Sequence, residues 1–294
     1  MSQTMPDLPG VEHRWVEADG IRFHIAEAGA DRPGKAVVLV HGFPQHWWTW
    51  RGVLPLLAEH RRAVALDLRG YGWSEAPAAG YDKKTFAKDI VAVVEALGLD
   101  KPVLVGHDWG GWSSLVAAVL RPEVFTAVAS VAVPAPWVQM PAKRPSILLY
   151  QNILGSGLGP WIIRSGNQRF LRLLFTRGTA PGSRNEENFE VFLERFREPA
   201  RARAGSATYR TFVRDEWPQL VSGGYLPGPA PIPTLLVRGS RDQLLGERAM
   251  RRAARDGADI DFHTIDEATH WLPEEQPEAL AGRLLAFADK VDPR

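Results

Sequence analysis

The sequence predicts an α/β protein with a mostly parallel central sheet, helices on both faces of the sheet and an inserted helical segment. Two observations lead to this prediction. Short apolar runs without polar alternation, typical of strands buried on both faces, alternate with helix-compatible stretches. This alternation stops over residues 134–231 and then resumes.

The elements follow from local patterns taken in chain order. Val11–Ala18 and Ile21–Ala28 predict a hairpin, because Asp19-Gly20 between them can adopt the positive φ values of a two-residue turn. Buried strands are expected at Ala36–Val40, Ala63–Leu66, Pro102–Val105 and Thr126–Val133, and further strands at Thr234–Val237 and Ile260–Thr264. Helices are expected at Trp48–Glu59, Lys83–Leu97, Trp109–Leu120, Glu247–Arg255 and Glu275–Lys290.

The segment from residue 134 to residue 231 carries helical patterns and no buried-strand run. Its expected helices are Ile147–Leu154, Trp161–Phe175, Asn185–Phe196 and Ala200–Arg214. The strands that follow must rejoin the same sheet, so the segment is an insertion rather than a second tandem domain. We therefore expect a core of residues 1–133 and 232–294 and a helical cap, or lid, of residues 134–231.

Composition excludes several classes of protein. The 294 residues carry 35 Lys+Arg against 34 Asp+Glu, so the chain lacks the basic excess of a nucleic-acid binder. It contains no cysteine, which excludes disulfides, thiolate metal sites and a thiol nucleophile. No signal-peptide core and no apolar run of about 18 residues is present, so we expect a cytoplasmic protein without a membrane span. The oligomeric state stays open, a homodimer included.

The segment Gly-His-Asp-Trp-Gly-Gly, from Gly106 to Gly111, is the sharpest chemical signal. It follows an expected strand and begins an expected helix, which is the layout of a nucleophile elbow, with Asp108 as the exposed central residue. The glycines allow backbone to pack closely against backbone, and the helix N-terminus favours an anion. The alternative is an ordinary strand-to-helix turn with Asp108 as the N-cap residue.

Two residues later in the chain complete a catalytic triad. His270 lies in the loop after the last expected strand, and Asp242 lies just after the strand that follows the insertion. The chain order is then nucleophile, acid, histidine, with each residue beyond the carboxyl end of a strand. Asp266 is a weaker candidate for the acid, because it is too near His270 in sequence to come from another strand end.

The segment His41-Gly42-Phe43-Pro44 directly follows the strand Ala36–Val40. Its Phe43 N–H, together with the Trp109 N–H after the nucleophile, could hold a developing oxyanion. The alternative is a Gly-Pro turn that has no catalytic role. In either case a cis peptide bond before Pro44 would explain a proline at so tight a turn. The histidines of this region lack the spacing of metal ligands on one face, so we expect no metal site and no cofactor.

These motifs resemble those of the α/β-hydrolase superfamily, and within it the branch of epoxide hydrolases and haloalkane dehalogenases. The matching residues are His41-Gly42-Phe43-Pro44, Gly106-His107-Asp108-Trp109-Gly110-Gly111, Arg238-Gly239-Ser240-Arg241-Asp242 and His270. The resemblance covers the core and implies an α/β-hydrolase fold. It also implies that Asp108 attacks a saturated carbon to form an alkyl ester, and that His270, oriented by Asp242, then activates water to hydrolyse the ester.

The leaving group separates the two activities of this branch. In the epoxide hydrolases, cap tyrosines protonate the epoxide oxygen. Tyr209, in a Tyr-Arg context, and Tyr150, in a Tyr-Gln context, resemble these residues, although the Phe-Gln-Glu-Pro-Gly pattern of many members is absent. Either tyrosine could instead be a packing aromatic. We expect an epoxide hydrolase.

Two alternatives remain. In a haloalkane or haloacid dehalogenase, the Trp109 indole N–H would bind the halide. Dehalogenases of the fluoroacetate type share His-Gly-Phe-Pro-Gln, but their two carboxylate-binding arginines are replaced here by Trp109 and Trp112. A non-catalytic, ligand-sensing relative is less expected, because Asp108, Asp242 and His270 are all present.

Tryptophan is unusually frequent, with 11 residues against 5 tyrosines, and most of the indoles lie near the expected site. Indoles around the expected site, together with the near-zero net charge of the chain, favour a small, apolar and neutral substrate. The residues expected to line its pocket are His41, Pro44, Trp109, Trp137 and Trp271.

Overall fold

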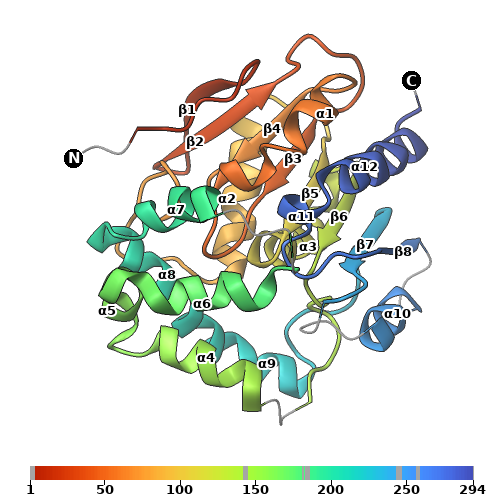
Figure 1. The fold of residues 1–294 in the computed structure, drawn as a ribbon. Coiled ribbons are helices and arrows are strands. Elements are labelled where there is room, and N and C mark those ends of the chain that lie inside the picture. The colour runs from red at the N-terminus through yellow and green to blue at the C-terminus, as the bar shows by residue number, and fades with distance from the viewer. Residues whose placement is uncertain are drawn as a thin grey trace.

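The strands of the computed structural model form one sheet in the order β1-β2-β4-β3-β5-β6-β7-β8 (Figure 1). The structure describes residues 4–141, 145–180, 182, 186–242, 247–255 and 259–293. Within these, the strands are β1 (Glu12–Ala18), β2 (Ile21–Ala28), β3 (Val37–Val40), β4 (Ala63–Leu66), β5 (Val103–His107), β6 (Ala127–Val131), β7 (Thr234–Gly239) and β8 (Ile260–Ile265). Each predicted strand is therefore confirmed to within a few residues.

The sheet is antiparallel only at one edge. β1 pairs with β2 as the predicted hairpin, β2 pairs antiparallel with β4, and the remaining pairs are parallel. At the carboxyl end of β3, Val40 lies between Leu66 of β4 and Gly106 of β5. This register brings the loop after β3 beside the turn after β5, so Phe43 and Asp108 become neighbours although 65 positions separate them.

Helices cover both faces of the sheet, as predicted. α1 and α12 pack together on one face, and α2 and α3 pack together on the other (Figure 1). The core helices are α1 (Leu54–Ala58), α2 (Lys83–Ala96), α3 (Trp109–Leu120), α10 (Glu247–Arg255), α11 (Leu272–Glu275) and α12 (Pro277–Val291), with 3₁₀ helices at Trp47–Trp50 and Pro122–Val124. No helix in the described part of the chain is both long enough and apolar enough to cross a membrane.

The segment between β6 and β7 is helical, as predicted, and we call it the cap. Its helices are α4 (Pro145–Gly155), α5 (Gly159–Arg164), α6 (Arg169–Gly178), α7 (Glu186–Arg195), α8 (Pro199–Thr211) and α9 (Trp217–Ser222), with a 3₁₀ turn at Gly166–Gln168 and a π-helical turn at Phe212–Glu216. Asn185, the expected start of one helix, lies outside the described residues. The domain boundaries at 134 and 231 stay a prediction.

Two predicted helices are wrong in extent, each for a local reason. The helix expected over Trp161–Phe175 is broken into α5 and α6, because three consecutive residues, Gly166 to Gln168, have left-handed φ values of 61°, 55° and 55°. The helix expected over Trp48–Glu59 is a 3₁₀ helix followed by the short α1. Pro55 has no N–H to bond the carbonyl of Arg51, so a continuous helix cannot form there.

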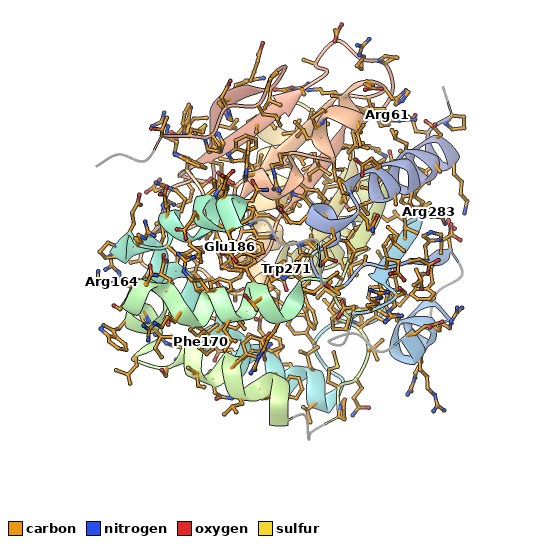
Figure 2. All side chains as sticks on the ribbon, viewed as in Figure 1. Arg61, Arg164, Phe170, Glu186, Trp271 and Arg283 are labelled. Atoms are coloured by element: carbon orange, nitrogen blue, oxygen red, sulfur yellow. The ribbon has the colours of Figure 1, made fainter. Side chains whose placement is uncertain are left out.

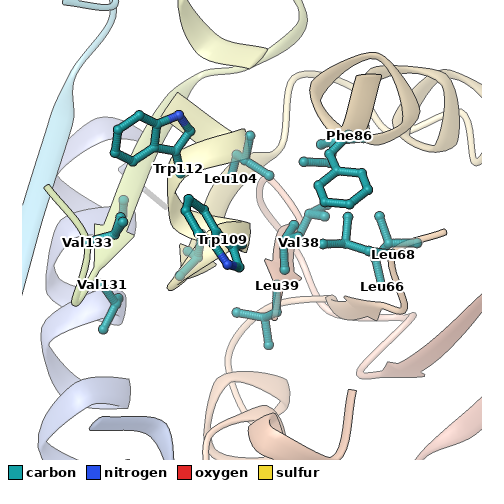
Figure 3. Packing of buried hydrophobic residues seen from close by; sticks show 14 of the residues in the cluster. Val38, Leu39, Leu66, Leu68, Phe86, Leu104, Trp109, Trp112, Val131 and Val133 are labelled. Atoms are coloured by element: carbon teal, nitrogen blue, oxygen red, sulfur yellow. The ribbon is translucent and has the colours of Figure 1, made fainter. Parts of the chain in front are cut away.

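Large apolar side chains fill the space between the sheet and the α2–α3 layer. Figure 3 shows Phe86 of α2 near Leu66 and Leu68, and Trp112 of α3 near Val133. All five side chains are 5% exposed or less. This packing fixes α3, and with it the turn from which α3 begins.

A buried arginine, Arg61, joins the end of α12 to the segment just before β4, at the amino end of that strand. The Arg61 side chain has no exposed surface. It donates to the carboxylate of Asp289 at 2.7 Å, to the carboxylate of Asp292 at 2.6 Å and to the Asp292 carbonyl at 2.7 Å. Figure 2 labels Arg61 in this part of the molecule. The guanidinium therefore has charged and neutral acceptors for the bonds it lost to water.

Candidate active site

Asp108 stands at a sharp turn between β5 and α3. Its φ of 52° and ψ of −126° are unusual for a residue with a Cβ atom, and such strain concentrates at functional sites. The neighbouring glycines are required by close contacts. A Cβ atom on Gly106 would lie 2.3 Å from the Gly110 carbonyl oxygen, and one on Gly110 would lie 2.3 Å from the His41 carbonyl oxygen. The local sequence therefore folds as the predicted elbow, with the Asp108 side chain above the sheet.

The two carboxylate oxygens of Asp108 have different partners. Oδ1 accepts a hydrogen bond of 2.9 Å from the Phe43 N–H, and Oδ2 lies 3.4 Å from Nε2 of His270. Burial alone would raise the pKa of Asp108, but the interactions with His270 and with the Trp109 N–H outweigh it, so the pKa is lowered. Asp108 is thus ionised at neutral pH, as a carboxylate nucleophile must be.

His270 lies between two carboxylates. It follows β8 in a loop, and its Nδ1 lies 3.6 Å from Oδ2 of Asp242, a side chain without exposed surface. Burial would lower the pKa of His270, but Asp108 and Asp242 together raise it to about 10. The imidazole is therefore protonated in the free protein. Asp266, the weaker candidate for the acid, is exposed at the end of β8.

The loops that carry Asp242 and His270 are held together by backbone contacts. Arg241 N–H donates to the Ala268 carbonyl at 2.9 Å. A Cβ atom on Gly239 would lie 2.3 Å from that same oxygen, so glycine is required at this position. These contacts hold the loop that carries Asp242 against the loop that carries His270.

Both cap tyrosines face this site. The Tyr209 ring on α8 lies 5.0 Å from the Phe43 ring and 5.8 Å from the Trp109 ring, and the Tyr150 ring on α4 lies 5.9 Å from that of Tyr209. Burial raises the pKa of each tyrosine, and the negative charge of Asp108 raises both further. Both hydroxyls therefore keep their protons and are available as acids.

The remaining predicted pocket residues differ in what they can offer a substrate. Trp271 is buried, and its ring lies 4.8 Å from that of His270; Figure 2 shows it between the cap and the core. Trp137 is half-buried in the turn region after β6. In the described part of the chain, the indole N–H groups of Trp137 and Trp271 have no hydrogen-bond partner. The Trp109 indole interacts with the Tyr209 hydroxyl, which offsets part of the rise in the pKa of Tyr209.

His41 supports the loop after β3, which also contains Pro44. His41 has no exposed surface; its Nδ1–H donates to the Gly42 carbonyl, and its Nε2 accepts from the Leu68 N–H. Both ring nitrogens are used, so His41 has no polar atom to offer a substrate. The Phe43–Pro44 bond is cis, as predicted.

An open groove of 640 Å³ on the α2–α3 side of the molecule includes none of the predicted site residues.

Sequence reasoning missed two residues that support the site. The Nε2–H of His107 donates to the His270 carbonyl at 2.8 Å, and burial followed by the charge of His270 lowers the pKa of His107 to about 4, so its ring stays neutral. Asp67 accepts a hydrogen bond of 2.7 Å from the Trp47 N–H and thereby anchors the loop after β3. The position of Asp67 directly after β4, at the carboxyl edge of the sheet, was an available signal.

An elbow aspartate, a backbone donor at its carboxylate and a histidine between two acids on this sheet define the class of protein. The chain belongs to the family described as alpha/beta hydrolase fold, which matches it over residues 35–277. It is a hydrolase of this family, and the relatives below place it in the epoxide hydrolase branch.

Two curated relatives and one solved structure cover nearly the whole chain. The soluble epoxide hydrolase of Corynebacterium sp. (strain C12) is 30% identical and aligns over 94% of this chain and 97% of its own length. Epoxide hydrolase A of Mycobacterium tuberculosis is 29% identical over 96% and 98%. Wild-type Cfl2 from Burkholderia cenocepacia is 31% identical, with a TM-score of 0.84 over 96% of this chain and 97% of that one.

Proposed function

We propose that this protein hydrolyses small neutral epoxides to vicinal diols through a covalent ester on Asp108. The observation that carries the proposal is the pair of protonated tyrosines, Tyr209 and Tyr150, at the site of an ionised elbow aspartate. A carboxylate can displace at saturated carbon without prior deprotonation, whereas an epoxide oxygen leaves readily only when it is protonated. The names of the curated relatives support the same substrate class.

In the first step, Oδ2 of Asp108 attacks an epoxide carbon and the carbon–oxygen bond of the ring breaks. The electron pair of that bond goes to the epoxide oxygen, which takes a proton from Tyr209 or Tyr150. The product is a hydroxyalkyl ester of Asp108. Because Oδ1 is already bound by the Phe43 N–H at 2.9 Å, the oxygen that faces His270 is the one left to attack.

In the second step, His270 first gives its proton to the deprotonated tyrosine. The neutral imidazole then takes a proton from water, and the resulting hydroxide attacks the ester carbonyl carbon. Negative charge then develops on Oδ1, where the N–H groups of Phe43 and Trp109 stabilise it. The tetrahedral intermediate collapses, the proton of the added hydroxyl passes to the leaving alkoxide, and the diol leaves. Ionised Asp108 and protonated His270 are thereby restored as in the free protein. Asp242 stabilises the imidazolium during this step.

Ester formation itself changes the state of His270. In the free protein the negative charges of Asp108 and Asp242 hold its pKa near 10, and a protonated imidazole cannot act as a base. The ester carries no charge, so the contribution of Asp108 disappears when the first step is complete. We infer that His270 becomes a base only after Asp108 has been alkylated, which prevents it from activating water too early.

Haloalkane dehalogenation is a second candidate. It is favoured by the indole N–H of Trp109, a buried donor next to the proposed nucleophile that could bind a halide. The same triad would carry both steps, and no tyrosine proton would be needed.

Parallel assays with styrene oxide and 1-bromobutane separate the two candidates. Formation of phenylethanediol without bromide release is the expected outcome. Bromide release without diol formation would reverse the assignment. Tight binding of a small molecule, without turnover of any epoxide or haloalkane in a panel, would instead indicate a ligand-sensing protein.

A further inference from the structure

Lys83, the first residue of α2, has a side chain without exposed surface. Burying an ammonium is costly unless its charge is paired and its donors are bonded. Here Nζ lies 2.7 Å from Oε2 of Glu216 and donates to the Thr208 carbonyl at 2.8 Å. Neither residue belongs to the core: Thr208 is on α8, and Glu216 ends the π-helical turn that follows it.

The partners of this ammonium flank the reacting groups. Thr208 immediately precedes Tyr209, the proposed acid. The ammonium also lies 4.4 Å from the ring centroid of Trp109, the residue that follows Asp108, and 5.1 Å from that of Phe212. A cation over an indole face is attracted by the ring quadrupole. One buried charge therefore contacts both the neighbour of the proposed nucleophile and the neighbour of the proposed acid.

Glu216 holds Lys83 from a second direction. Its Oε1 accepts hydrogen bonds of 2.9 Å from the Lys83 backbone N–H and 2.9 Å from the Tyr225 hydroxyl. Both the main chain and the side chain of Lys83 are thus bound by one buried carboxylate. The start of α2 and the end of α8 are joined by three polar contacts shielded from water.

The π-helical turn accounts for the direction of Glu216. Pro218 has no N–H with which to bond the carbonyl of Arg214, so a regular α-helix cannot continue through this segment. The chain instead makes the wider turn Phe212–Glu216, and such turns often occur at functional sites. Glu216 is the last residue of this turn, and its carboxylate meets α2.

We propose that Lys83 is a positioning residue for Tyr209: it fixes α8 over Asp108 through the Thr208 carbonyl and the Glu216 carboxylate, and so keeps the tyrosine hydroxyl aimed at the epoxide oxygen. This proposal rests on the proposed function. Ring opening depends on the place of Tyr209. Ester hydrolysis depends on His270, water and the backbone N–H groups at Oδ1, to none of which the Lys83 side chain is hydrogen-bonded. Loss of Lys83 should therefore slow the first step selectively.

The test is a double-mutant cycle between Lys83→Met and Tyr209→Phe. Each variant is made in a His270→Gln background, and accumulation of the styrene oxide adduct is followed by intact mass in a single turnover. K83M should slow adduct formation roughly 10- to 100-fold, the cost of misplacing a reacting group by about an ångström. The combination K83M/Y209F should be no slower than Y209F alone. Lys88→Met, an exposed lysine on the same helix, is the matched control and should leave the rate unchanged.

A second readout separates positioning from general destabilisation. With native His270, hydrolysis of the preformed ester should proceed at the same rate in K83M as in the parent protein, and Lys83→Arg should recover part of the lost rate of ester formation. Equal slowing of both steps, or effects of K83M and Y209F that multiply, would overturn the proposal.

If circular dichroism shows K83M to be unfolded, Tyr225→Phe replaces it in the cycle. This variant removes one hydrogen bond from Glu216 and leaves the Lys83 pair in place. It should slow adduct formation by a smaller factor, and this effect should likewise vanish beside Y209F; an undiminished effect there contradicts the proposal. If the parent protein turns over no epoxide, the proposed function fails and this inference with it; epoxide turnover with a multiplicative cycle removes only the role of Lys83.

Discussion

Oδ2 of Asp108 lies 3.4 Å from Nε2 of His270, so the two groups proposed to act in successive steps form an ion pair in the free protein. The pair raises the pKa of the histidine and lowers that of the aspartate. Each partner is thereby held in the charge state required before the reaction begins. The ion pair between Asp108 and His270 is lost only when one of the two residues loses its charge.

The pKa of His270 should therefore depend on Asp108. Titration of ¹⁵N-labelled imidazole by NMR should give a pKa of about 10 in the parent protein. Asp108→Asn should lower it, because one of the two carboxylates that stabilise the imidazolium is removed. An unchanged pKa in D108N would mean that Asp242 alone sets the titration and that esterification cannot release the base.

The same ion pair should make stability depend on pH. The pKa of His270 is higher in the folded state than the ordinary value of 6.5, so its contribution to stability is complete below about pH 6.5 and is lost as the pH rises through about 10. The melting temperature of the parent protein should fall over this range. His270→Gln should show a shallower fall; parallel curves for the two proteins would contradict the ion pair.

The covalent step can be observed directly. In a single turnover in H₂¹⁸O, with enzyme in excess over styrene oxide, ¹⁸O should enter the Asp108 carboxylate, because water attacks the ester carbonyl and not the substrate carbon. His270→Gln should accumulate an adduct of substrate mass on the peptide containing Asp108, and Asp108→Asn should form none. Label found only in the diol would exclude the ester.

Removing the proton donors should affect the first step. Tyr209→Phe and Tyr150→Phe should each slow ester formation from styrene oxide, with a combined loss of roughly 10²- to 10⁴-fold for general acid catalysis. Stopped-flow or quench measurements of ester formation, not kcat alone, give the relevant rate. A double variant that opens the ring at the parental rate would show that another group donates the proton.

The glycines of the elbow should be intolerant of a methyl group. A Cβ atom on Gly110 would lie 2.3 Å from the His41 carbonyl oxygen, so Gly110→Ala should lower the free energy of unfolding by about 1–3 kcal/mol. Gly282→Ala, on α12 with no atom within 4 Å of its added Cβ, is the control and should be neutral or slightly stabilising. Chemical denaturation measures the free energy of unfolding of both variants. Equal stabilities of the two variants would mean that the elbow shifts to accommodate the added methyl group.

Much of the core could be predicted because burial on both faces leaves a local signature. The runs that became β3 to β7 are mostly apolar and lack polar alternation, and the loops after three of them contain Phe43, Asp108 and Asp242. Parallel strands end at one edge of a sheet, so a pattern local in sequence was enough to predict which distant residues meet.

The cap was less predictable because its contacts are not local. Gly166, Asn167 and Gln168 have left-handed φ values and break one expected helix. Of the three, only glycine adopts this conformation without a steric cost, so the sequence gives little warning of the break. Lys83 next to Lys84 has the pattern of a solvated helix start. Its burial depends on Glu216, 133 positions away, and no spacing rule connects the two residues.

The hydrogen bonds between Arg61 and the end of α12 have a practical consequence for anyone who shortens this chain. Two of the acceptors, the carboxylate and the carbonyl of Asp292, lie within the last three residues of the 294. Trimming the chain at Val291 would remove both of these acceptors and leave the guanidinium with Asp289 as its remaining carboxylate. A C-terminal tag should accordingly be appended after the full sequence and not substituted for its last residues.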